Sequence, residues 1–139
     1  MMHYRIGFVI TIFIASLTLA AAPPATQPTT QPMKKFTDID VNKFEEMIRQ
    51  PNTVILDVRT PEEYAAGHLK DAKLINVRAP DFAMQIAKLD KSKTYLVHCR
   101  SGVRSVTACN ALGELGIPNL YNMLGGINAW TAAGKPVEK

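Results

Sequence analysis

Residues 94–105 read TYLVHCRSGVRS, and this stretch decides how the chain folds. The first five residues form an apolar, partly β-branched run that is typical of a strand. Cys99 follows at once, Gly102 permits a tight loop, and a helical pattern covers residues 105–115 until Gly116 closes it. The stretch therefore predicts a strand, a tight loop and a helix, with a thiol at the end of the strand.

The same alternation of patterns continues on either side. Residues 53–57, TVILD, form a β-branched apolar run of the kind that is buried on both faces of a sheet. Strands are predicted over 36–39, 53–57, 74–77, 94–98 and 120–122, and helices over 41–50 (with Asp40 as N-cap), 61–66, 81–89, 105–115 and 127–133. This order predicts an α/β fold with a mostly parallel, five-stranded sheet and helices on both faces. Ligands of such folds bind beyond the carboxyl ends of the strands, which directs attention to the loops after residues 57 and 98.

The first 33 residues differ in composition from the rest. A short positive start ends at Arg5, residues 6–20 (IGFVITIFIASLTLA) carry no charge, and small residues follow. This order is typical of a secretory signal peptide, so we expect a signal over 1–20 that is cleaved after Ala20. The apolar run is short for a membrane span, which needs about 20 residues; a retained anchor is the alternative.

Export implies a periplasmic or secreted protein without stable membrane insertion after cleavage. Residues 21–33, AAPPATQPTTQPM, are rich in Pro, Thr and Gln, which predicts a linker. The folded domain is then expected over 34–139.

Charge and composition exclude some function classes. The net charge is +4 and 47% of the residues are apolar, which is enough for one core. The basic residues are scattered rather than gathered in a stripe, so we expect no nucleic-acid partner. A mild positive bias still helps to attract a small anion.

The loop after the strand combines a nucleophile with a site for an anion. A thiolate at Cys99 would gain from the unpaired amides of the helix N-terminus, from the charges of Arg100 and Arg104, and from the tight curl that Gly102 permits. The alternative is that Cys99 is a buried structural thiol. We predict Cys99 as the catalytic residue, with these residues binding substrate: Arg100, Ser101, Gly102, Val103, Arg104 and Ser105.

Three motifs in order resemble the rhodanese family. They are HCRSGVRS (98–105), LDVRTPEEYAAGHLKDAKLINV (56–77) and YNMLGGINAW (121–130), and together the resemblance covers about 36–137. With the N-terminal signal, the chain is similar to small exported rhodaneses of the phage-shock type.

The resemblance implies a sulfurtransferase that needs no metal and no organic cofactor. Cys99 would take sulfur from a small anionic donor such as thiosulfate and become a persulfide. Cyanide or a thiol acceptor would then remove that sulfur. Arg100 and Arg104 would bind the donor anion, and the loop amides would hold the persulfide. We expect the protein to be a monomer.

Two other readings remain open. One is a binding module that carries sulfur as a persulfide but turns over poorly by itself. The other is a phosphatase or arsenate reductase, whose loop also begins His-Cys and ends in Arg. That loop has one more residue between Cys and Arg than the four found here, 100–103, and the shorter ring of amides favours a sulfur atom over a tetrahedral oxyanion.

Other candidate residues receive supporting roles. Asp57, Arg59, Glu63 and His68 could form a catalytic cluster, but we interpret Arg59 as the partner of a carboxylate that holds the loops in place. His98 is expected to be structural.

Two further residues stand out by their positions. Cys109 lies ten residues after Cys99 on a helix, about 15 Å along it, too far for a disulfide. Leu124 stands before the Gly-Gly pair where the family pattern suggests a polar residue, which makes one wall of the loop region more apolar.

Overall fold

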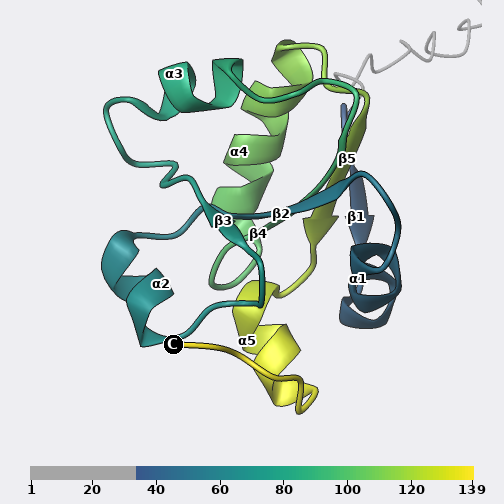
Figure 1. Cartoon of the computed structure of the whole chain (residues 1–139), viewed down its shortest axis with the longest axis vertical. Coiled ribbons are helices and arrows are strands. Elements are labelled where there is room, and N and C mark those ends of the chain that lie inside the picture. Colours follow the sequence, from purple (N-terminus) through teal and green to yellow (C-terminus); the bar gives the residue numbers. More distant parts are fainter. Residues whose placement is uncertain (1–33) are drawn as a thin grey trace, which may run out of the picture. The chain divides into compact units, whose positions relative to one another are not determined.

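The computed structural model describes residues 34–139. The expected signal peptide, its cleavage site and the linker all lie outside the described residues. Five strands form one parallel sheet in the order β1-β5-β4-β2-β3 (Figure 1). Their bounds are β1 Thr37–Ile39, β2 Thr53–Asp57, β3 Lys73–Leu74, β4 Thr94–His98 and β5 Asn119–Met123.

Four helices connect the strands: α1 Val41–Ile48, α2 Pro61–Ala66, α3 Phe82–Ala87 and α4 Val103–Glu114. A fifth helix, α5 Gly126–Ala132, follows β5. The predicted α/β class, parallel sheet and number of strands are confirmed. No helix among residues 34–139 is long and apolar enough to span a membrane.

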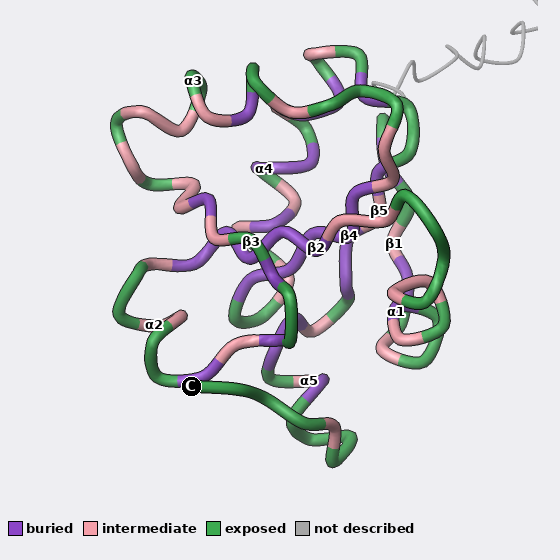
Figure 2. Tube along the Cα trace, viewed as in Figure 1, coloured by how far each residue is buried: buried purple, intermediate pink, exposed green. Residues whose placement is uncertain are grey.

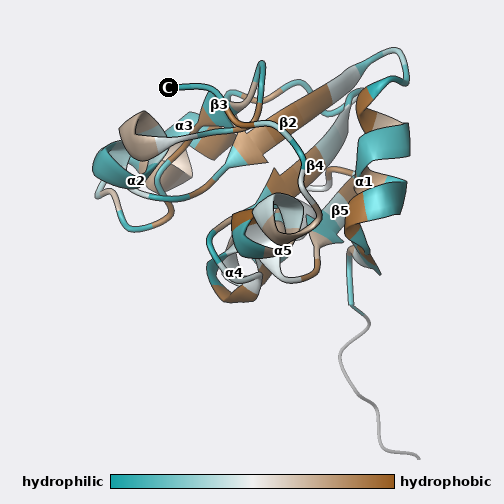
Figure 3. Cartoon of the chain, turned by 90° about the horizontal axis from the view of Figure 1, so that it is seen from below, coloured by the Kyte–Doolittle hydropathy of each residue, from teal (hydrophilic) through white to brown (hydrophobic). Residues whose placement is uncertain are grey.

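The sheet separates two apolar clusters, and this places helices on both of its faces. Along β4, Tyr95 and Val97 belong to one cluster while Leu96 belongs to the other, as the alternation of side chains in a strand requires. The first cluster includes Ile86 of α3 and residues of α4, and the second includes residues of α1 and α5. Figure 2 shows burial along β2 and β4, and Figure 3 shows β2 largely in the hydrophobic colour and α1 largely in the hydrophilic one.

Local sequence explains where several elements begin. Asp40 caps α1 as predicted, because its carboxylate accepts a hydrogen bond from the Lys43 N–H at 2.8 Å. Thr60 and Glu63 form a reciprocal capping box at the start of α2, and Pro61 occupies its first position. The strands β2 and β4 have the predicted bounds, because both are continuous buried runs.

Two elements differ clearly from the prediction. Helix α4 begins at Val103 instead of residue 105, because Gly102 takes a left-handed conformation (φ 92°) and is itself the N-cap. In place of the strand predicted over 74–77, the edge strand β3 covers Lys73–Leu74, although the Ile75 and Val77 amides still donate to the carbonyls of Asp57 and Val58. The remaining ends of β1, β5, α1, α3 and α5 differ by one or two residues.

Candidate active site

Cys99 lies directly after β4, at the end of the sheet formed by the carboxyl ends of the parallel strands. The next strand, β2, ends beside it, since the Val58 N–H donates to the His98 carbonyl at 3.0 Å. The loop from Cys99 to Gly102 then turns back into α4. This is the strand, tight loop and helix that the sequence predicts, and Cys99 itself is buried.

The loop surrounds the sulfur of Cys99 with hydrogen-bond donors. The Gly102 N–H lies 3.1 Å from Sγ, and the Ser105 hydroxyl lies 3.4 Å from it. Burial by itself raises the pKa of Cys99, but the Ser105 hydroxyl and the amides of Ser105, Ser101 and Gly102 outweigh burial and lower it below the usual value. The loop is therefore built to hold a sulfur anion.

The carbonyl groups of the same loop point the other way, toward the start of α5. The Ile127 N–H donates to the Cys99 carbonyl at 2.8 Å, and the Asn128 N–H donates to the Arg100 carbonyl at 3.1 Å. Gly126 makes this approach possible, since a Cβ there would lie 2.4 Å from the Cys99 carbonyl oxygen. Helix α5 thus fixes the peptide orientation that leaves the loop amides for the sulfur.

The sequence reading assigned Gly126 and Ile127 no role at the site. The sequence did contain an indication for Gly126. The Gly-Gly pair follows β5, so it lies near the loop that follows the neighbouring parallel strand β4.

The two loop arginines lie in different environments. Arg104 forms a forked ion pair with Glu63 of α2, with both nitrogen–oxygen distances 2.7 Å. The hydrogen bond from Arg104 lowers the pKa of Glu63 to about 2, and the same bond raises the pKa of Arg104. Arg100 is exposed, and its side chain makes no hydrogen bond or ion pair with residues 34–139. Arg104 therefore ties α4 to α2, whereas Arg100 stands open to solvent.

Asp57 and Arg59 form the expected ion pair behind the loop. Arg59 Nε lies 2.9 Å from Asp57 Oδ1, and its Nη2 lies 2.6 Å from Oδ2. Nη2 also donates to the Gly67 carbonyl at 2.7 Å, which joins the end of β2 to the end of α2. His68 is apart from this pair: its ring stacks on Tyr64, and its backbone bridges to Glu138.

His98 is fully buried on the side of the sheet where α1 and α5 pack. Its Nδ1 lies 3.3 Å from the Cys99 carbonyl oxygen, and its Nε2 lies 3.7 Å from Asp57 Oδ2 without a hydrogen-bond partner among the described residues. Burial holds the pKa of His98 below its usual value, so the ring is neutral near pH 7. These contacts agree with the expected structural role.

The second cysteine has the opposite environment. Cys109 is fully buried in the cluster beneath α4, and burial raises its pKa to about 12. Both cysteines are free. Cys99 lies in the loop before α4, so the ten residues between them are not all helical as the sequence argument assumed.

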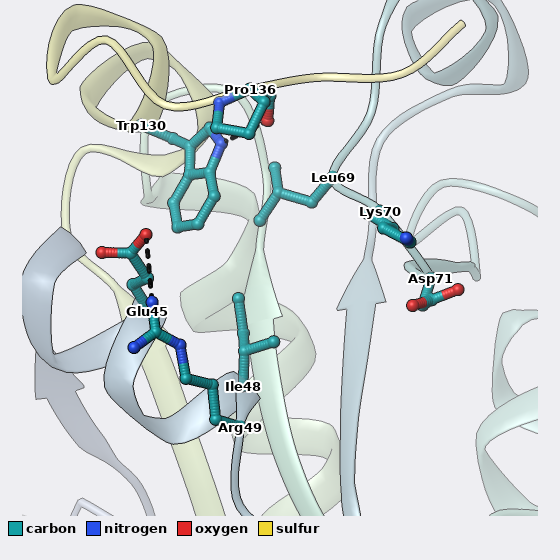
Figure 4. A pocket seen from close by; sticks show the side chains of 8 residues that line it. All are labelled: Glu45, Ile48, Arg49, Leu69, Lys70, Asp71, Trp130 and Pro136. Atoms are coloured by element: carbon teal, nitrogen blue, oxygen red, sulfur yellow. Dashed lines mark hydrogen bonds and ion pairs between the residues drawn. The ribbon is translucent and has the colours of Figure 1, made fainter.

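Shallow depressions lie on the surface of the described part of the chain. One lies beside the loop and is lined by Arg59, Glu63, Asn128 and Val137, among others. Another contains no loop residue and has an apolar floor of Ile48, Leu69 and Trp130 with charged side chains around it (Figure 4). Among residues 34–139, no group of three or more His, Cys, Asp or Glu side chains is placed to hold a metal ion.

Comparison with known proteins gives consistent results. The sequence pattern of the rhodanese-like domain matches residues 40–133. A sulfurtransferase of Allochromatium vinosum is 32% identical over 101 residues, which are 72% of this chain and 92% of that protein. The thiosulfate sulfurtransferase GlpE of Vibrio cholerae is 31% identical over 106 residues, 76% of this chain and 98% of that protein. A rhodanese-related protein from Thermoplasma volcanium has a similar crystal structure (TM-score 0.66, 29% identity), with 73% of this chain and 97% of that one covered.

Proposed function

The chain belongs to the rhodanese-like domain family, and from this premise we propose that it moves sulfane sulfur from thiosulfate, or a similar donor, to cyanide or a thiol through a persulfide on Cys99. A sulfurtransferase activity in general follows from its relatives. The observation that supports the specific proposal is the pair of donors at Cys99 Sγ, the Gly102 amide and the Ser105 hydroxyl, because such donors favour a negatively charged sulfur.

The reaction then has two balanced halves. The Cys99 thiolate attacks the outer sulfur of thiosulfate, the S–S bond of the donor breaks, and sulfite leaves with the electron pair. The new persulfide carries its charge on the outer sulfur. An acceptor thiolate or cyanide attacks that outer sulfur, the bond to Sγ breaks, and Cys99 recovers its thiolate. We propose no separate base, because the donors around Sγ lower the pKa of Cys99 and so favour its thiolate.

The loop amides stabilise both the Cys99 thiolate and the persulfide that forms from it. These amides are fixed before substrate arrives, since α5 holds the carbonyls of Cys99 and Arg100. Donors oriented in advance stabilise developing charge without reorganisation. Arg100, which is exposed, and Arg104, which faces Glu63, are proposed to attract and bind the donor.

A persulfide carrier with little turnover is the alternative that the same geometry permits. A steady-state assay with thiosulfate and several acceptors, cyanide and small thiols among them, separates the two. Repeated turnover with any acceptor supports the enzyme, and one discharge without reloading supports the carrier. Turnover of an aryl phosphate at a comparable rate would overturn both and favour a phosphatase.

A further inference from the structure

Two exposed apolar residues, Val103 and Leu124, lie on segments next to the loop that contains the candidate nucleophile. Four large apolar residues are exposed in the described part of the chain: Met84, Val103, Leu124 and Val137. Val103 is 72% exposed at the first position of α4, and Leu124 is 51% exposed between β5 and the Gly-Gly pair. Neither side chain is needed to fill the core, so folding does not account for them.

Gly102 brings these two residues together. A Cβ at Gly102 would lie 3.1 Å from the Gly125 nitrogen and 3.3 Å from the Met123 carbonyl oxygen, the two backbone atoms on either side of Leu124. Val103 follows Gly102 directly, so Val103 and Leu124 lie on two segments in backbone contact. The Gly102 N–H of this same contact points at Cys99 Sγ. The two backbone segments that carry Val103 and Leu124 therefore meet next to the amide that binds the sulfur. We call these two exposed residues the apolar rim.

Among residues 34–139, few unpaired charged groups near the apolar rim are available to bind a polar ligand. The charge of Arg104 is balanced by Glu63 in a forked ion pair. Arg100 is the remaining cation of the loop, and it is exposed. In the proposed function the loop amides and the two arginines serve the small anionic donor. An acceptor larger than cyanide must place the atoms behind its sulfur against the loop edge, because Cys99 is recessed.

We propose that Val103 and Leu124 select the sulfur acceptor, and that they favour a thiol with an apolar body over a polar thiol of the same size and reactivity. The proposal rests on the proposed function and concerns only its second half. In that half the acceptor thiolate attacks the outer sulfur, becomes a persulfide itself and returns the electron pair to Cys99. An apolar body gains by covering the rim, whereas a hydroxyl in the same place loses water without finding a partner.

The test measures discharge of a preformed persulfide. The protein is loaded with thiosulfate, the donor is removed, and persulfide loss is followed by mass with 1-butanethiol or 3-mercapto-1-propanol, which differ only by a terminal methyl or hydroxyl group. The wild type should prefer butanethiol roughly fivefold, the scale of one partly buried methyl group. Because the preference is a ratio within one protein, general damage to the loop cancels.

Substitutions then assign the preference to the rim. Leu124→Ser and the double variant Val103→Ser with Leu124→Ser should bring the ratio toward one, and Leu124→Met should keep it. Met84→Ser is the matched control: Met84 is 64% exposed but lies on α3, and its variant should keep the wild-type ratio. A ratio near one in the wild type, or an unchanged ratio in the double variant, overturns the proposal.

The two proposals fail in different ways. If thiosulfate leaves no persulfide on Cys99, the proposed function itself is wrong. If the persulfide forms and cyanide discharges it, but the two thiols react alike, only the role of the apolar rim is wrong.

Discussion

Cys99 and Cys109 show how the same thiol acquires opposite properties in one domain. Both residues are fully buried, and burial raises the pKa of both thiols. Among residues 34–139, hydrogen-bond donors surround the sulfur of Cys99 but not that of Cys109, so the pKa of Cys99 is lowered while that of Cys109 rises to about 12. At the residue scale, donor placement rather than exposure separates the thiol with a lowered pKa from the thiol with a raised one.

The Ser105 hydroxyl is the largest of the contributions that lower the pKa of Cys99. Ser105→Ala should therefore raise that pKa and slow persulfide formation about tenfold, the scale of one hydrogen bond to a charged group. The rate of alkylation by iodoacetamide, followed against pH, measures the shift: the curve should move to higher pH. Ser101→Ala retains the backbone amide by which Ser101 acts, and its curve should stay in place. Equal curves for the wild type and Ser105→Ala would contradict this role of the hydroxyl.

The bounds of a helix or strand could be predicted where the residue pattern of that segment alone determines them. Strands β2 and β4 are buried runs with polar ends, and the sequence predicts their bounds. The start of α4 was predicted two residues late, because its cap is the backbone of Gly102 rather than a capping side chain. The Glu63–Arg104 pair joins residues 41 positions apart, and nothing local to either one indicates its partner.

The link between α2 and α4 should depend on pH. Arg104 lowers the pKa of Glu63 to about 2 in the folded state, from 4.5. The lowered pKa means that the ionised Glu63 stabilises the folded state. This contribution to the free energy of unfolding is fully present above about pH 4.5 and is lost as the pH falls toward 2. Glu63→Gln should therefore lower the free energy of unfolding at pH 7 by on the order of 2 kcal/mol. Urea unfolding at pH 7 and at lower pH should show the difference from the wild type becoming smaller.

Glu62→Gln is the matched control for this link, because Glu62 lies on the same helix turn, is exposed and forms no ion pair with residues 34–139. Its unfolding curve should stay close to that of the wild type. A Glu63→Gln variant as stable as Glu62→Gln at pH 7 would show that the ion pair adds no stability.

The contact of α5 with the loop can be tested at Gly126. Gly126→Ala would place a methyl group 2.4 Å from the Cys99 carbonyl oxygen, in addition to requiring a positive φ. Gly134→Ala requires a positive φ with no atom within 4 Å, so it isolates the backbone cost. We expect Gly134→Ala to cost about 1 kcal/mol and Gly126→Ala roughly 2 kcal/mol more. Gly126→Ala should also lower activity, and equal effects in the two variants would contradict the close approach.

At the scale of the whole molecule, parallel strands bring distant residues to one edge of the sheet. The ends of β2, β4 and β5 supply Arg59, Cys99 and the Gly-Gly pair, in the way that doubly wound folds build their sites. The sequence motifs therefore predicted which segments come together, while the catalytic and binding roles of their residues stay predictions. Its detailed contacts follow from packing across elements, which short motifs do not encode.

The N-terminal segment leads to a separate prediction about where the molecule resides. The charged start, apolar stretch and small residues of 1–22 predict export, with a mature chain that begins near Ala21. N-terminal sequencing of the protein isolated from its native compartment checks this directly. An intact apolar stretch on the isolated protein would instead indicate a membrane anchor.

Detection of the persulfide intermediate on Cys99 tests the proposed mechanism most directly. Intact mass and peptide mapping after exposure to thiosulfate, without acceptor, should show one additional sulfur atom on the peptide that contains Cys99. Cyanide should remove it. Cys99→Ser should gain no sulfur, and Cys109→Ser should behave as the wild type, because Cys109 has a raised pKa and no donors at its sulfur among the described residues. Sulfur found on Cys109, or transfer that survives in Cys99→Ser, would contradict the assignment of the nucleophile.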